Sequence, residues 1–146
     1  MTTLRKYLKD HIVIADGAMG TMLQAQEPSL SDFQNHEGCN EILNVTRPDI
    51  VKAVHTAYLQ VGVDAIETNT FGANLANLAE YGIEDRIYEL ALAGAKIARE
   101  CADEFSTKDK PKFVLGSVES STTGKVEAVA NIWASLLISA TPSRPT

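Results

Sequence analysis

The stretch Gly-Val-Asp-Ala-Ile-Glu-Thr-Asn-Thr-Phe-Gly at residues 62–72 decides how this sequence folds. Glycine commonly ends helices, so Gly62 predicts a helix that stops just before it. Residues 63–66, Val-Asp-Ala-Ile, follow directly and are predicted to form a strand. Polar residues from Glu67 onward then predict a strand end and a loop. The stretch therefore predicts a helix followed closely by a strand.

The flanking residues predict further helices and strands in alternation. Proline is favoured as the first residue of a helix, and we predict that helix over 48–61. Its apolar stripe is Ile50, Val54, Tyr58 and Val61. A second helix is predicted over 85–105, with the stripe Ile87, Leu90, Gly94, Ile97, Cys101 and Phe105. We also predict a short helix over 4–9, a loop over 26–44, a buried strand over 12–15 and a further strand over 113–116.

This order of elements predicts an α/β fold with parallel strands and right-handed crossovers. Two architectures share it: an open doubly wound sheet and a (β/α)8 barrel. Both gather polar groups at the carboxyl ends of their strands, so Asp16 and Gly17 are expected near residues 67–71. The sequence lacks the glycine-rich dinucleotide-binding motif and the phosphate-binding P-loop motif. The first absence disfavours dinucleotide binding, and the second excludes a P-loop.

The composition is that of a globular protein with an acidic balance. The 146 residues include 13 Lys and Arg against 19 Asp and Glu, a formal net charge of −6. Because there is no basic run, we expect neither a nucleic-acid partner nor a membrane partner. No apolar stretch approaches the roughly 18 residues of a spanning helix, and the N-terminus lacks the pattern of a secretory signal. Two cysteines make no disulfide framework, so the expected location is cytoplasmic.

The composition changes after residue 117, which predicts two parts, 1–117 and 118–146. The second part holds only four charged residues, which are Glu119, Lys125, Glu127 and Arg144. It also holds nine Ser and Thr, against twelve in the longer first part. An apolar helical pattern around residues 126–138 carries no functional motif.

Four blocks of the sequence resemble one family. They are residues 16–24 (Asp-Gly-Ala-Met-Gly-Thr-Met-Leu-Gln), 38–48 (Gly-Cys-Asn-Glu-Ile-Leu-Asn-Val-Thr-Arg-Pro), 62–72, and 113–117 (Phe-Val-Leu-Gly-Ser). In this order they are similar to the N-terminal homocysteine-binding barrel of cobalamin-dependent methionine synthases, in the homocysteine S-methyltransferase family. The similarity is nearly continuous over residues 10–117. The betaine- and methylmethionine-dependent homocysteine methyltransferases share the Asp-Gly opening and match the other blocks less well.

The resemblance implies a (β/α)8 barrel that transfers a methyl group to homocysteine and so forms methionine. In that family a zinc ion held by three cysteines binds the homocysteine thiolate, and methylcobalamin, recharged from methyltetrahydrofolate, donates the methyl group. The resemblance further implies that Asp16 binds the substrate's ammonium group, that Gly17 offers its backbone N–H, and that Phe71 walls the pocket. Glu67 and Asn69 are further substrate-binding candidates from the same rim.

The chain departs from the family pattern in three ways. A complete barrel takes about 250 residues, so we expect about the first three β/α units of a barrel here. There is no adjacent pair of cysteines, and Cys39 and Cys101 do not lie at the positions of the family's zinc ligands. We therefore expect no catalytic residue, no metal and no bound cofactor in this chain. The segment 118–146 does not resemble the family, which a truncated or frameshifted reading frame, or a disordered tail, would explain.

Three hypotheses for function are left open by the sequence. The first is an N-terminal piece of a methionine synthase that is inactive alone. The second is a non-catalytic fragment that binds an amino acid or self-associates through open strand edges. The third is an independent small α/β enzyme, for which the sequence shows no nucleophile with a neighbouring base.

Each candidate residue also has a structural interpretation. Asp16 can cap a turn, Glu67 and Asn69 can tie down a strand end, and Phe71 can belong to the core. Two ligands do not make a zinc site, so the spacing of His36 and Cys39 predicts loop residues rather than a metal site. We predict a packing role for Cys101 and structural roles for His55 and His11.

Overall fold

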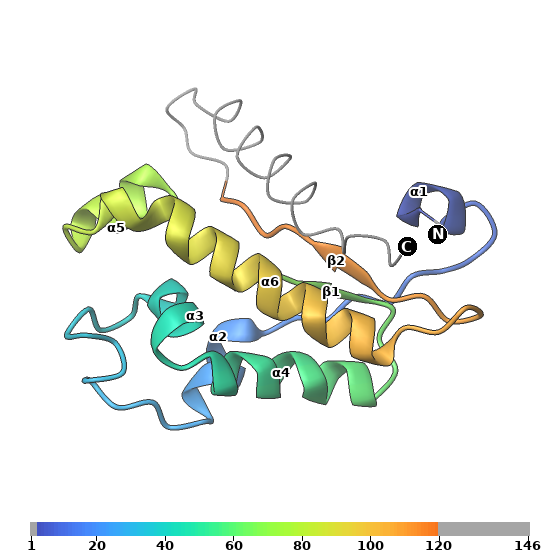
Figure 1. Cartoon of the computed structure of the whole chain (residues 1–146), viewed down its shortest axis with the longest axis horizontal. Helices are drawn as coiled ribbons and strands as arrows, with labels where there is room; N and C mark the ends of the chain where they lie inside the picture. The colour runs from blue at the N-terminus through green and yellow to red at the C-terminus, as the bar shows by residue number, and fades with distance from the viewer. Residues whose placement is uncertain (1–2, 120–146) are drawn as a thin grey trace, which may run out of the picture.

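The computed structural model describes residues 3–119, and the predictions for residues 120–146 lie outside that part of the chain. The described residues form a mixed helix and strand fold (Figure 1). Its α-helices are α1 (Leu4–Tyr7), α2 (Met19–Gln24), α3 (Leu43–Thr46), α4 (Pro48–Gln60), α5 (Leu75–Glu80) and α6 (Ile87–Phe105). Two 3₁₀ turns, η1 (Asn40–Ile42) and η2 (Glu84–Arg86), precede α3 and α6. The strands are β1 (Ala65–Glu67) and β2 (Phe113–Leu115).

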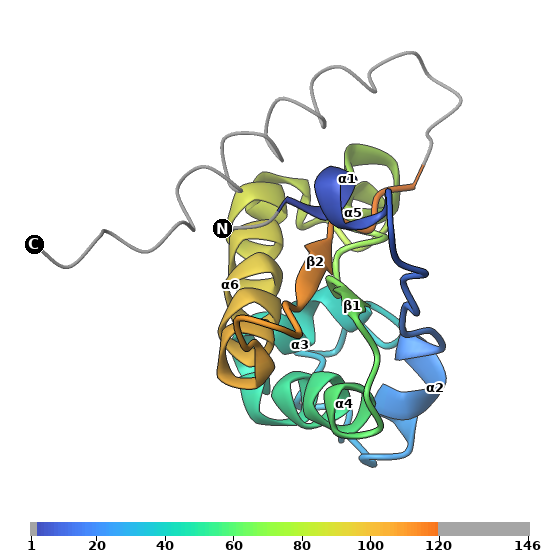
Figure 2. The same cartoon turned by 90° about the vertical axis from the view of Figure 1, so that its right-hand side faces the viewer.

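The two strands form a small open parallel sheet. They pair in the register Ala65 with Phe113 and Glu67 with Leu115, and they lie side by side in Figure 2. On the other edge of β1, Ala15 makes a parallel bridge with Ala65. The Asp16 N–H donates to the Ala65 carbonyl at 3.0 Å, and the Ala65 N–H donates to the Ile14 carbonyl at 3.1 Å. The predicted parallel pairing is therefore confirmed, with β1 in the middle.

The prediction of a buried strand over 12–15 is wrong. The segment contributes a single bridge, and the side chains of Ile12 and Ile14 are 90% and 61% exposed. Asp64 fixes the backbone of this segment, because its Oδ2 accepts from the Ile14 N–H at 3.0 Å and its own N–H donates to the Ile14 carbonyl at 2.7 Å. The two isoleucines belong to neither large core cluster of the described residues. The run therefore has the residue types of a strand without the packing that would bury it.

Helices α4 and α6 run alongside each other and pack against the strands (Figure 1). One core cluster joins α4, α6 and the segments around η1, and a second joins β1 to the C-terminal half of α6. Their fully buried members include Leu23, Ile42, Leu43, Val51, Leu90, Ile66 and Cys101. Burial of these side chains is the main force that holds the helices to the sheet. Within the described residues, no helix is both long and apolar enough to cross a membrane.

Both long helices are confirmed, with one error in the stripe of α4. The structure exposes Val61 to 81%, and the buried face instead contains Val51 and His55 beside Ile50 and Val54. Val61 lies just beyond the last helical residue, where the chain turns through Gly62 with a φ of +101°. That positive φ explains the glycine at this helix end. In α6, Leu90, Gly94 and Cys101 are buried as predicted.

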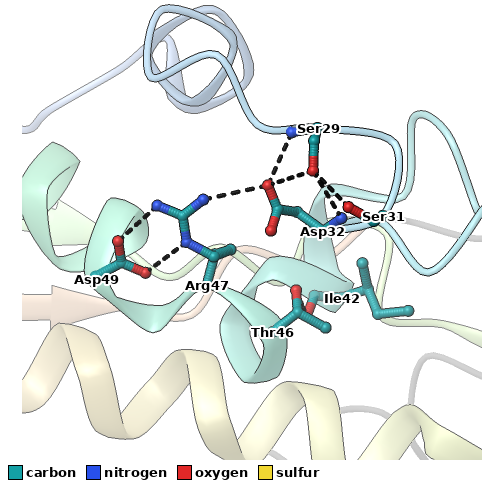
Figure 3. A network of polar contacts seen from close by, with 7 residues as sticks. All are labelled: Ser29, Ser31, Asp32, Ile42, Thr46, Arg47 and Asp49. Atoms are coloured by element: carbon teal, nitrogen blue, oxygen red, sulfur yellow. Dashed lines mark hydrogen bonds and ion pairs between the residues drawn. The ribbon is translucent and has the colours of Figure 1, made fainter.

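The predicted loop over 26–44 is wrong at its C-terminal end. Residues 40–46 form η1 and α3, and their burial among core side chains overrides the loop-like composition. The remaining loop is tied to the start of α4 by Arg47 (Figure 3). The Arg47 guanidinium pairs with Asp49 at 2.7 Å and with Asp32 at 3.2 Å. Ser29 donates to the same Asp32 oxygen at 2.8 Å, and these bonds lower the pKa of Asp32.

The structural role predicted for His55 is confirmed, and the environment of its side chain is unusual. The side chain is completely buried on α4, and neither ring nitrogen has a hydrogen-bond partner among residues 3–119. Burial lowers the pKa of His55 from 6.5 to about 4, because an imidazolium there would be desolvated and unpaired. Between these two values the unfolded chain binds more protons than the folded chain. This histidine therefore destabilises the fold as pH falls from about 6.5 to about 4.

We predict that His55→Leu removes this part of the pH dependence. Acidification from pH 7.5 to 4.5 should lower the free energy of unfolding of the wild type by about 2–3 kcal/mol more than that of the variant. This difference follows from the shifted pKa through proton linkage. Urea unfolding at the two pH values measures the difference. His11→Leu, at an exposed histidine, is the matched control. Equal pH dependence of wild type and His55→Leu would contradict the assignment.

Candidate functional site

A pocket of about 240 Å³ opens at the carboxyl end of the sheet. Four segments line the pocket: the turn after residue 15, η1, the loop after β1, and the residues after β2. Its lining consists of Asp16, Gly17, Ala18, Met19, Gly20, Asn40, Glu41, Glu67, Thr68, Asn69, Thr70, Phe71 and Ser117. The structure therefore brings together all five residues that the sequence predicts as a binding site.

Asp16 is half-buried at the point where the first segment turns away from β1. Its Oδ1 accepts the Glu67 N–H at 2.9 Å, so the carboxylate does tie two segments together. Burial raises the pKa of Asp16 to about 6, and the nearby Glu67 carboxylate adds to the shift against the opposing hydrogen bond. A carboxyl group with this pKa changes charge close to neutral pH, which is a property of many binding and catalytic groups.

Gly17 and Ala18 carry the chain along the pocket wall. Gly17 is exposed, and within the described residues its N–H donates to no protein acceptor. Ala18 has left-handed backbone angles, with φ at 42° and ψ at 43°. For an alanine, this conformation costs about 1 kcal/mol or more. The strained residue turns the chain sharply into α2, so that the exposed backbone of Gly17 borders the pocket.

Three predicted residues follow on or after β1, and their environments differ. Glu67 is exposed, and its Oε2 accepts the Ser117 hydroxyl at 3.2 Å. Asn69 is buried, and its Nδ2 donates to the Asn40 carbonyl at 2.8 Å and to Asn44 Oδ1 at 3.0 Å. Phe71 is 55% exposed, so it is not a core residue. Asn69 thus has the structural contacts that the sequence left as its alternative role.

The sequence predictions missed a hydrogen-bond network on the pocket wall, formed by the hydroxyls of Thr68 and Thr70 and the backbone of Ser117. The Ser117 N–H donates to Thr68 Oγ1 at 3.0 Å, and Thr70 Oγ1 donates to the Ser117 carbonyl at 2.9 Å. Thr68 and Thr70 share a hydrogen bond of 2.6 Å, in which Thr68 donates because the Thr70 proton is already used. Their spacing of two residues after a strand is the one sequence signal that could have placed both on the same face.

The residues after β2 also pack beside the site. Glu119 Oε2 accepts from the side-chain amides of Asn74 at 3.1 Å and Asn77 at 2.7 Å. Its backbone N–H donates to the Phe71 carbonyl at 3.3 Å. Residues 117–119 therefore continue the packed structure across the boundary that composition predicts at residue 117.

The pocket is acidic. Among the described residues, its charged lining consists of Asp16, Glu41 and Glu67, with no Lys, Arg or His. Such a lining favours a cationic group such as an ammonium, which gains Coulomb energy and charged hydrogen bonds there.

The cysteines do not fit a three-thiolate zinc site. Cys39 and Cys101 are both buried, one beside η1 and the other within α6. Burial raises the pKa of both thiols, which opposes the thiolate form that binds metal. His36 stands edge-on to Tyr81, with ring centroids 6.0 Å apart. Across residues 3–119 there is no group of three His, Cys, Asp or Glu that could hold a metal ion.

Comparisons with known proteins agree on one family. The sequence profile described as homocysteine S-methyltransferase matches residues 13–132, and so runs past residue 117. Methionine synthase of Mycobacterium tuberculosis is 50% identical over 121 residues, which are 83% of this chain and 10% of that protein. Methionine synthase of Mycobacterium leprae gives the same identity and coverage. The chain thus spans about a tenth of the length of these relatives.

Solved structures show the same similarity in fold. The homocysteine methyltransferase MmuM from Escherichia coli, in its metallated form, matches with a TM-score of 0.68 and 23% identity over 94% of this chain and 54% of that one. Its oxidized form matches with a TM-score of 0.64 and 25% identity over 80% and 40% of the two chains. The described fold is therefore similar to part of a homocysteine methyltransferase.

Proposed function

We infer the function of this chain from its family, because the chain belongs to the homocysteine S-methyltransferases. We propose that its pocket binds the amino-acid end of homocysteine. The observation that carries this proposal is that Asp16 and Glu67 line one pocket that has no cationic side chain among its described lining residues. The description of the matching family supports homocysteine as the substrate. We propose that residues 1–117 are about the first three β/α units of a (β/α)8 barrel in a cytoplasmic protein.

Each predicted residue then has a distinct role. The Asp16 carboxylate accepts hydrogen bonds from the ammonium group, and the free Gly17 N–H donates to the substrate carboxylate. Glu67 adds negative charge, and the exposed ring of Phe71 covers the apolar methylenes. Asn69 supports the site through its contacts with Asn40 and Asn44. An ammonium next to Asp16 favours the charged form of this acid and so lowers its pKa from about 6.

Methyl transfer needs more than binding of the amino-acid end of the substrate. The attacking group is a thiolate, and a free thiol has a pKa near 8.5. The described residues hold no metal-binding group that would lower it. We therefore propose that the chain alone binds homocysteine but does not transfer a methyl group. In the family, zinc and methylcobalamin supply that chemistry.

A second proposal concerns association between copies of the chain. Exposed Ile12 and Ile14 lie on one side of the small sheet, and β2 is the edge on the other side. Unpaired strand edges with apolar side chains favour pairing with another chain. This association would be a property of the fold rather than a catalytic function.

We predict that binding depends on the ammonium group. L-homocysteine should bind, and N-acetyl-L-homocysteine should bind roughly 10- to 100-fold more weakly, because it lacks a charged partner for Asp16. Asp16→Asn should weaken the binding of L-homocysteine to a similar degree. Wild-type affinity should rise with pH through about 6, as Asp16 ionises. Titration calorimetry measures all three, and equal affinity for the two ligands would contradict the proposal.

We predict no methionine formation by the purified chain. The assay supplies methylcobalamin, L-homocysteine and zinc, with a complete enzyme of the family as the positive control. The expected rate is the uncatalysed background. Zinc-dependent turnover above background that Asp16→Ala abolishes would show instead that a second copy completes the site.

We predict that charged residues on the exposed segment 12–15 reduce self-association. The double variant Ile12→Lys and Ile14→Lys should shift the chain toward the monomer, because edge lysines oppose strand pairing. Light scattering across a concentration series measures the mass. Val61→Lys, at an exposed apolar residue on a helix end, is the matched control. A wild-type chain that stays monomeric throughout would refute this idea.

A further inference from the structure

We propose that Glu41 is a positioning residue that holds the Phe71 wall of the pocket through the backbone of Gly72. The use of that wall in homocysteine binding rests on the function proposed above. The positioning itself concerns only contacts within this chain. It is therefore measurable with or without a ligand.

The contact between Glu41 and Gly72 is short and buried. Glu41 lies in η1 with only 9% of its surface exposed, and its Oε1 accepts the Gly72 N–H at 2.7 Å. A hydrogen bond to an ionised acceptor is shorter and stronger than a neutral one. Its other side-chain contact within the described residues is weak, since Cys39 Sγ lies 3.9 Å from Oε2. The Gly72 N–H is thus the main partner of this carboxylate among the described residues.

The space around Gly72 supports the same assignment independently. A Cβ atom at this position would lie 2.9 Å from Glu41 Oε1 and 3.1 Å from Oε2. The carboxylate therefore rests directly against the glycine backbone, where no side chain fits. The glycine allows a close approach of the two segments.

Phe71 needs such a support because its own packing does not fix it. The ring lines the pocket but is 55% exposed, so its place depends on how the backbone of residues 70–73 is held. The Glu119 N–H holds the Phe71 carbonyl from one side at 3.3 Å. Glu41 accepts the Gly72 N–H of the same peptide group from the other side. Of these two anchors, only Glu41 also lines the pocket.

The rival role for Glu41 is direct contact between its charge and a bound ammonium. Glu41→Gln separates the two roles, because the amide keeps an oxygen that can accept from Gly72 but loses the charge. Glu41→Ala removes both the hydrogen bond and the charge. Gly72→Ala keeps the charge but forces the carboxylate away from the residue-72 N–H. Glu104→Ala, at an exposed glutamate paired with Lys52, is the matched control.

The experiment measures two quantities in the full chain: hydrogen exchange of the residue-72 amide by NMR, and the Kd for L-homocysteine. In Glu41→Ala and Gly72→Ala we expect exchange at least about tenfold faster and a Kd about tenfold weaker. Glu41→Gln should stay within about threefold of wild type in both. Circular dichroism checks that each variant is folded, and Gly72→Ala serves as the test if Glu41→Ala does not fold.

The outcomes separate this inference from the proposed function. Unchanged amide exchange in folded Glu41→Ala overturns the positioning role. Loss of affinity in Glu41→Gln with normal amide protection also overturns it, in favour of direct charge contact. A wild-type chain that does not bind L-homocysteine contradicts the proposed function, while the exchange data still decide whether Glu41 holds the Phe71 wall.

Discussion

The buried side-chain amides of Asn44 and Asn69 form the contact on which the rest of the structure depends. Asn44 Nδ2 donates to the Asn69 carbonyl at 2.7 Å and to the Leu90 carbonyl at 3.1 Å. Asn69 Nδ2 donates back to Asn44 Oδ1 at 3.0 Å. This pair joins α3, the loop after β1 and α6 in one place. Loss of the Asn44 amide would take this donor from the buried Asn69 carbonyl, and loss of the Asn69 amide would take the donor from Asn44 Oδ1. A buried acceptor left without a partner costs more than the bond itself contributes. The pocket wall is built on that loop, so the site inherits its geometry from this contact.

The same contact explains a residue that would otherwise weaken α6. Glycine in a helix interior costs about 1 kcal/mol relative to alanine, yet Gly94 lies in the middle of α6. A Cβ atom there would lie 2.7 Å from Asn44 Nδ2 and 2.8 Å from Thr70 Cγ2. The helix must come this close for the Leu90 carbonyl to meet Asn44. A local cost in helix propensity thus permits the packing that fixes both the core and the site.

Local pattern predicted the parts of the structure that local forces determine. Periodicity and end signals placed α4, α6, β1 and β2, and the carboxyl-end rule placed Asp16 near Glu67. The errors occur where distant segments meet. Residues 12–15 have strand composition but lack a covering layer, and residues 40–46 have loop composition but are buried. Glu41 was missed as a site residue for the same reason, since its partner lies 31 residues away. Asn69 was predicted at the site, but its contacts with η1 and α3 follow only from the fold.

The charge of Asp16 favours the proposed binding role over a simple turn cap. Because burial raises its pKa from 3.8 to about 6, the folded chain binds the proton more tightly than the unfolded chain. Ionised Asp16 therefore destabilises the fold as pH rises from about 4 to 6, the reverse of the effect of His55. A neutral asparagine would accept the Glu67 N–H without this cost. Turn formation alone thus does not account for a carboxylate beside Glu67, whereas a cationic ligand would offset the repulsion. The pocket carries its charge at a cost to stability, which is the pattern expected where function rather than folding determines the residue.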